Sequence, residues 1–74
     1  MARLPGEIDG RRFLRTMRRL GWVVGSSRGS HVTLVHVETG QKLFVAFHGT
    51  MYRPAVQDAL EIAGITPEEF LDAY

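Results

Sequence analysis

The chain has 74 residues, of which 45% are hydrophobic and 23% are charged, as in ordinary globular proteins. A chain this short builds one modest core, so we expect a single domain over residues 1–74. The lack of cysteine excludes disulfides and thiolate metal sites. No apolar run approaches the ~20 residues that span a bilayer, and the first residues lack the apolar core of a signal peptide. We therefore expect a cytoplasmic protein with no membrane partner.

The formal net charge of +1 hides an asymmetry between the two halves of the chain. Arginines crowd the first half: Arg3, Arg11, Arg12, Arg15, Arg18, Arg19 and Arg28. After Pro54 the charged residues are all acidic: Asp58, Glu61, Glu68, Glu69 and Asp72. Because a guanidinium binds phosphate through two parallel hydrogen bonds, this pattern indicates a polyanion-facing side and an opposite, solvated side. A solvated helix face is the alternative interpretation of the same arginines.

A helix is predicted over residues 10–20. Asp9 can cap its first turn through the side-chain carboxylate, and Gly21 is typical of a left-handed stop. Between them, apolar residues recur at steps of three and four: Phe13, Leu14, Met17 and Leu20. The arginines of this segment fall around the rest of the helix surface.

Three strands are predicted next, over residues 22–25, 31–37 and 42–47, with a polar connection over 25–30. A second helix over residues 54–63 begins at Pro54 and ends at Gly64. A capping box at Thr66 begins a short helix over 67–73. The order α-β-β-β-α(-α) predicts a small α+β domain in two layers. Its antiparallel three-stranded sheet would carry the helices on one face.

The register of the second and third strands follows from their turn. A two-residue turn at Thr39-Gly40 pairs Leu34 with Val45, and it pairs His31 with His48. Alternate residues then form an apolar patch that faces the helices: Val32, Leu34, Val45 and Phe47. The two histidines would lie opposite each other on the other face, with Cβ atoms ~5 Å apart.

His31 is the candidate catalytic residue, because histidine gains and loses protons near neutral pH. Cleavage of RNA without a metal needs a base for the 2′-hydroxyl, an acid for the leaving 5′-oxygen and cationic or amide donors for the phosphorane. Arg28 offers charge, Gly29 allows close approach of the backbone, and Ser30 offers a hydroxyl. His48 is a candidate second acid or base. The alternative is a glycine-serine turn followed by a strand that begins with histidine.

The remaining candidates are weaker. Lys42, near the turn, is placed to touch phosphate, although a solvated lysine is the default interpretation. His36 lies on the same side of its strand as the residues that face the helices, so we interpret it as structural. A zinc site formed by the three histidines is therefore not expected. Trp22 and Phe47 are interpreted as core residues rather than base-stacking platforms. We expect no metal and no cofactor.

Four segments in this order resemble the HicA family of bacterial toxins: Phe13 to Val23, Arg28 to His31, Val45 to His48 and Ala63 to Ile65. The resemblance spans nearly the whole chain. It implies a fold similar to double-stranded RNA-binding domains, cleavage of mRNA without a metal, and silencing by a HicB antitoxin. The family's catalytic histidine maps onto His31. The chain departs from the family pattern at Ala46, where proline is usual, and at Pro54 to Gln57, where the family commonly has Gly-Thr-Leu-Arg.

The resemblance and the residues together predict an mRNA interferase, an endoribonuclease toxin of a type II toxin–antitoxin system. Its catalytic candidates are His31 and His48. Its RNA-binding candidates are Arg28, Gly29, Ser30, Arg11, Arg12, Arg15 and Lys42. Two alternatives stay open. One is a non-catalytic RNA-binding module of the same fold, and the other is a protein-interaction partner whose basic helix docks an acidic protein.

Overall fold

The computed structural model describes residues 3–74. Its elements, in chain order, are β1 (Glu7–Asp9), α1 (Gly10–Arg19), β2 (Trp22–Arg28), β3 (His31–His36), β4 (Lys42–Ala46), β5 (Thr50–Tyr52), α2 (Arg53–Ala63) and α3 (Pro67–Ala73). The side-chain carboxylate of Asp9 accepts a hydrogen bond from the Arg12 backbone N–H and so caps α1. Thr66 and Glu69 form a reciprocal capping box at α3.

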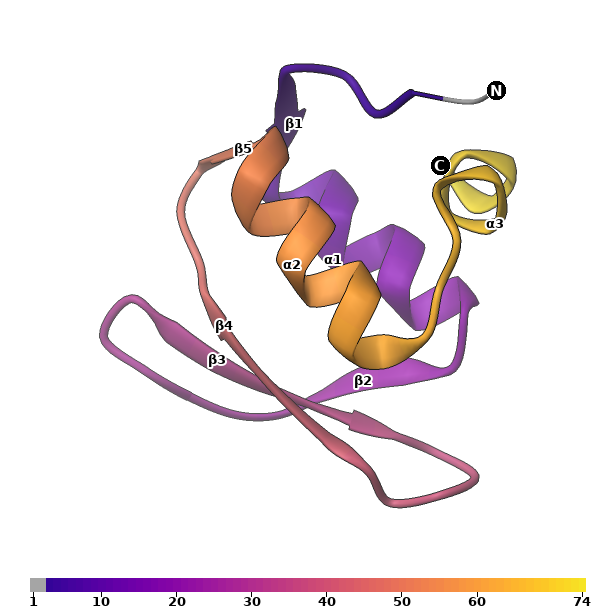
Figure 1. Ribbon diagram of the computed structural model, residues 1–74. Helices are drawn as coiled ribbons and strands as arrows, with labels where there is room; N and C mark the ends of the chain where they lie inside the picture. Colours follow the sequence, from indigo (N-terminus) through magenta and orange to yellow (C-terminus); the bar gives the residue numbers. More distant parts are fainter. Residues whose placement is uncertain (1–2) are drawn as a thin grey trace.

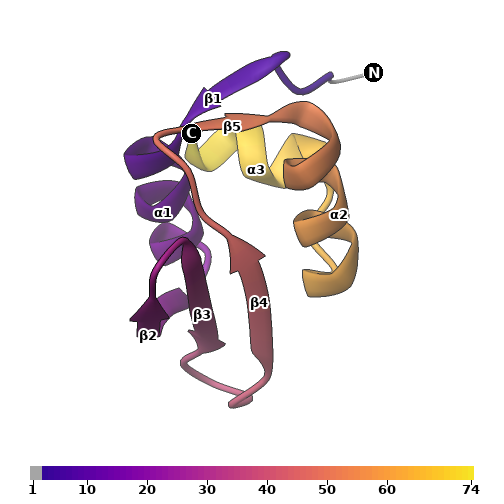
Figure 2. The same cartoon turned by 90° about the vertical axis from the view of Figure 1, so that its left-hand side faces the viewer.

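The strands β2, β3 and β4 form an antiparallel sheet in that order, and the helices lie on one of its faces (Figure 1). The short strands β1 and β5 pair at the end of the molecule where α1 and α2 begin (Figure 2). This arrangement confirms the predicted α+β class and is consistent with a fold similar to double-stranded RNA-binding domains.

The core lies between the sheet and the helical layer. Its residues come from every element described above: Leu4 and Ile8 near β1, Phe13 and Met17 from α1, Trp22, Val32, Leu34, Leu43 and Val45 from the sheet, Met51 from β5, Val56, Ala59 and Leu60 from α2, and Phe70 from α3. The rings of Phe13 and Phe70 lie 6.0 Å apart, which fixes α3 against α1. The sheet therefore packs one face, chiefly the inward residues of β3 and β4, against the helices and leaves the other face open.

One prediction about the strands is wrong, and two short strands were missed. The segment 25–30 is not a flexible connection, because β2 continues to Arg28 and turns directly into β3 through Gly29-Ser30. A bulge at Gly25 lets β2 keep pairing, and a side chain there would meet Val35 at 2.8 Å. The strands β1 and β5 were not predicted, since three-residue strands carry almost no local pattern.

The predicted register of β3 and β4 is wrong by two residues. His31 is opposite Ala46, and Val32 is opposite Val45. The loop is longer than predicted. The backbone N–H of His36 donates to the Gln41 carbonyl, and the backbone N–H of Gly40 donates to the His36 carbonyl. Because side chains alternate faces, a shift of two residues keeps every side chain on its predicted face.

Candidate functional site

The open face of the sheet gathers polar and basic side chains in three cross-strand rows. The first row is Arg28, His31 and Ala46, the second is Ser26, Thr33 and Phe44, and the third is Val23, Val35 and Lys42. None of these residues is acidic, and two are cationic at neutral pH. We call this surface the open face. It carries His31, Arg28 and Lys42 of the candidates that the sequence singled out, and the Gly29-Ser30 turn adjoins it.

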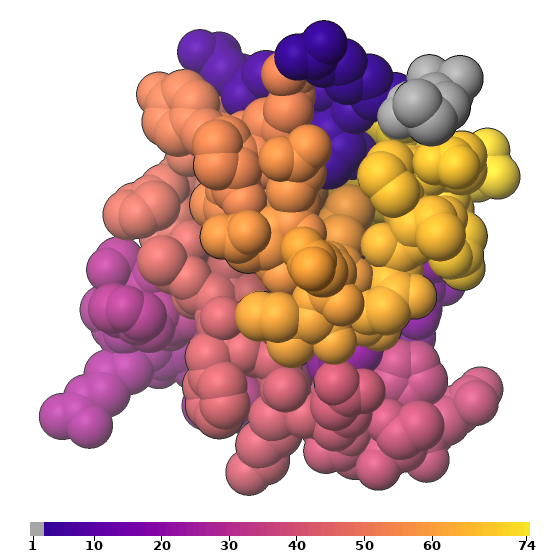
Figure 3. All heavy atoms as spheres, in the orientation of Figure 1, coloured from indigo at the N-terminus to yellow at the C-terminus, as the bar shows by residue number. Residues whose placement is uncertain are grey.

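His31 stands at the start of β3, exposed, and is directly opposite Arg28 across the β2–β3 hairpin. Cross-strand partners have Cβ atoms ~4.5–5.5 Å apart, so an imidazole and a guanidinium share one small area. The intervening turn has a positive φ of 59° at Gly29 and not at Ser30, as in a type II′ turn. The tip of this hairpin, purple in Figure 3, projects clear of the helical layer.

The Gly29 position requires glycine because of its backbone conformation. A Cβ added there would meet nothing within 4 Å, so the surrounding space is open. The Ser30 carbonyl accepts a hydrogen bond from the Phe47 N–H at 2.6 Å, which ties the turn to the end of β4. The turn is therefore held in place at its base, while its exposed side is free for a ligand.

Lys42 and Phe44 reach the open face from β4, an edge strand. Phe44 is 75% exposed, whereas its neighbours Leu43 and Val45 are buried in the core. Sequence reasoning missed Phe44. The signal was present, because the alternation that puts Leu43 and Val45 inside puts Phe44 outside.

His48 is not opposite His31, so the geometric argument for a histidine pair is wrong. It lies beyond the end of β4, exposed, and its backbone carbonyl packs against Gly10 at the start of α1. His36 has a structural role: its ring meets Trp22 edge-on at 5.1 Å, and Nδ1 accepts hydrogen bonds from the backbone N–H groups of Glu38 and Thr39.

The arginines of α1 divide into two sets. Arg12 lies over the Tyr74 ring, 3.6 Å from its centroid, and donates two hydrogen bonds to the Tyr74 carbonyl. Arg19 donates to the Ala73 carbonyl at 2.7 Å. Both side chains bind carbonyls at the end of α3, where cations are favoured. The structure thus places Arg12 in contacts within the protein, which the sequence did not predict.

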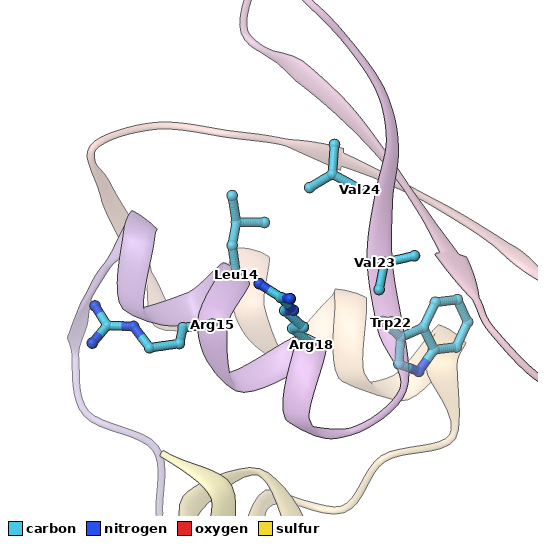
Figure 4. A pocket seen from close by; sticks show the side chains of 6 residues that line it. All are labelled: Leu14, Arg15, Arg18, Trp22, Val23 and Val24. Carbon is cyan, nitrogen blue, oxygen red and sulfur yellow. The ribbon is translucent and has the colours of Figure 1, made fainter.

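The exposed arginines Arg11, Arg15 and Arg18 follow one another at helical spacing along the outer side of α1. Arg15 and Arg18 border a shallow groove between α1 and β2 (Figure 4). Leu14 and the half-exposed Val24 lie in the same groove. Because α1 covers the opposite face of the sheet, these arginines form a second basic surface, separate from the open face.

Within residues 3–74 no helix is long and apolar enough to cross a membrane. The described part of the chain also holds no group of three or more histidine, aspartate or glutamate side chains that could bind a metal ion.

Comparison with known proteins identifies a family for this chain. Neither the search of curated proteins nor the search of solved structures found a similar protein. The family of the HicA toxin of bacterial toxin–antitoxin systems matches residues 10–65, from the start of α1 to just beyond α2. Membership of that family implies a cognate antitoxin as partner. Since the match covers most of the 74 residues and includes the whole open face, the chain belongs to the HicA toxin family.

Proposed function

We propose that the protein is an mRNA interferase, a toxin that cleaves RNA at the open face by histidine acid–base catalysis without a metal. One observation carries the proposal: His31 is exposed on a face without acidic residues, directly opposite Arg28. A free imidazole beside a cation is suited to a phosphodiester, because the substrate is an anion and the reaction moves protons.

In this mechanism the 2′-hydroxyl of the substrate attacks the adjacent phosphorus, and the 5′-oxygen of the next nucleotide leaves. The products are a 2′,3′-cyclic phosphate and a 5′-hydroxyl, so one proton leaves the nucleophile and one joins the leaving group. His31 carries one of these transfers. Arg28 stabilises the negative charge that grows on the non-bridging oxygens, and Ser30, an exposed residue of the same turn, donates its hydroxyl hydrogen to the same phosphate.

The second basic surface extends the RNA contacts. Arg11 and Arg15 are exposed on α1, so they are available to bind phosphates that flank the cleaved one. Arg12 is omitted from this role because its guanidinium already holds the Tyr74 carbonyl. We infer that the cognate antitoxin is HicB-like and that the toxin acts in the cytoplasm, where mRNA is found.

The test is cleavage of single-stranded RNA by purified protein in the presence of a metal chelator, with His31→Ala as the comparison. We expect cutting by the native chain, cyclic phosphate at the new 3′ ends, and loss of cutting in the variant with the same thermal unfolding midpoint. Activity that depends on a divalent metal, or that survives the substitution, would overturn the mechanism. Binding of RNA without cleavage would favour a non-catalytic RNA-binding module, and no RNA binding would favour a protein-interaction role.

A further inference from the structure

We propose that Phe44 is a stacking platform for an unpaired nucleobase of the RNA, next to the phosphate that His31 acts on. The inference rests on the proposed function and adds a substrate class to it: a single strand whose bases are free to turn onto the sheet. Four observations about the open face carry it.

The first observation is that the Phe44 side chain is exposed and that its exposure has no role in folding. Phe44 is 75% exposed, although Leu43 and Val45 on either side of it are 1% and 6% exposed. A phenyl ring facing water contributes almost nothing to the free energy of folding, because it buries little apolar area. Exposed aromatic rings on a polar face are typical of binding surfaces.

The second observation is distance from the catalytic candidate. Phe44 is opposite Thr33, and His31 is opposite Ala46, so Phe44 and His31 are diagonal neighbours on one face. Diagonal neighbours lie ~7–8 Å apart, which an aromatic side chain can bridge. One nucleotide can span this separation, with its phosphate beside His31 and its base over Phe44.

The third observation is the shape of the surroundings. The open-face positions beside Phe44 hold short side chains: Thr33 directly across, Ser26 beyond it, and Ala46 two residues further along β4. No other strand covers the outer side of β4, since β4 is the edge of the three-stranded sheet. Beyond the edge of β4 the ring shares a shallow pocket with Asp58 and Ile62 of α2. A flat base therefore lies on the ring from the sheet side, where the neighbouring side chains are short.

The fourth observation is charge. Lys42 precedes Phe44 by one step on the same face, and Arg28 lies beside His31. Cations on both sides of an aromatic ring match a nucleic acid strand, whose phosphates alternate with bases. The base must be unpaired, because a base within a duplex already has neighbours on both of its faces.

A cleavage experiment tests the consequence for catalysis. Phe44→Ala should lower kcat/KM on single-stranded RNA by roughly 5- to 150-fold, mainly through KM, as expected for the loss of one stacked base. Phe44→Trp should restore most of the loss, because indole stacks as well as phenyl does. The matched control is Tyr52→Ala: Tyr52 is an exposed aromatic residue, 58% exposed, on β5 and outside the three-stranded sheet, and its loss should leave kcat/KM unchanged. Equal kinetics for native and Phe44→Ala proteins would overturn the inference and leave the proposed function standing.

A binding experiment in the His31→Ala background separates stacking from cleavage. We expect a single-stranded oligonucleotide carrying 2-aminopurine to lose fluorescence on binding, and Phe44→Ala to abolish that quenching without altering the salt dependence of affinity. If the native chain cuts no RNA but the quenching depends on Phe44, the cleavage proposal fails and the stacking platform stands. If Phe44→Ala changes only self-association or antitoxin binding, Phe44 belongs to a protein interface and the inference is wrong.

Discussion

The β3–β4 hairpin has two faces that share one backbone and differ in use. The covered face presents Val32, Leu34, Leu43 and Val45, all buried against α1 and α2. The open face presents His31, Lys42 and the exposed Phe44. Alternation along a strand thus assigns neighbouring residues to separate tasks, folding on one side and ligand contact on the other. In a domain of 74 residues this separation matters, since so small a core has little stability to spare.

The sharpest test of the comparison uses two adjacent residues of β4. Leu43→Ala should lower the free energy of unfolding by about 3 kcal/mol, because it leaves a cavity under the helices. Phe44→Leu should change the free energy of unfolding by less than ~0.5 kcal/mol, because the side chain is exposed. Chemical denaturation of both variants measures the difference. A large loss of stability in Phe44→Leu would show that the open face also serves folding.

A second test compares two arginines with different surroundings. Arg28→Gln should weaken RNA binding about tenfold and flatten its salt slope by about 0.7, the value for one phosphate contact on a single strand. Arg12→Gln should leave that slope unchanged and lower the unfolding temperature, because it removes the contacts with Tyr74. Affinity measured across a salt series, together with thermal unfolding, gives both readouts. A reduced salt dependence of RNA affinity in Arg12→Gln would show that Arg12 contacts RNA phosphate after all.

Several features of the fold were predictable because their signals are local. Asp9 before α1, Gly64 after α2 and the capping box at Thr66 each fix a helix end through a few neighbouring atoms. The face of the sheet on which each side chain of β3 and β4 lies was also predictable, because side chains alternate between the two faces along a strand. That alternation places His31 outside and Leu34 inside whichever turn joins the strands.

The features that the sequence predicted wrongly or missed depend on contacts between residues distant in the chain, or on unusual hydrogen-bond acceptors. The loop before β4 is wide because the His36 ring accepts the N–H groups of Glu38 and Thr39, and no propensity encodes that. The pairing of Ile8 with Met51 joins segments more than forty residues apart. The role of Arg12 depends on where α3 packs, which is known only once the core is assembled. The predicted pairing of His31 with His48 was wrong because it assumed a two-residue turn in place of this wider loop.

His48 offers a smaller test of where the open face ends. His48→Ala should change kcat/KM by less than about twofold, because Ala46 and not His48 is opposite His31. His31→Ala under the same conditions provides the reference for full loss of activity. A defect in His48→Ala as large as that of His31→Ala would extend the catalytic surface past the end of β4 and would restore a two-histidine mechanism.

The smallest expected effect concerns α3, which packs on α1 and contributes no residue to the open face. Hydrogen bonds from Thr66, first from its backbone N–H and then from its side chain, hold the pKa of Glu69 below the usual range of a glutamate. A carboxyl whose pKa is lowered by folding adds stability above its unfolded pKa of about 4.3 and loses it as the pH falls through the folded value. Glu69→Gln keeps an oxygen that can accept the Thr66 N–H but does not titrate. The native chain should therefore melt above the variant at pH 7, and this difference should shrink as the pH is lowered through the acidic range. RNA affinity at pH 7 should be equal in the two proteins. If the substitution altered RNA binding as well, the helical layer and the open face would be coupled, and the separation between the two faces of the sheet would fail.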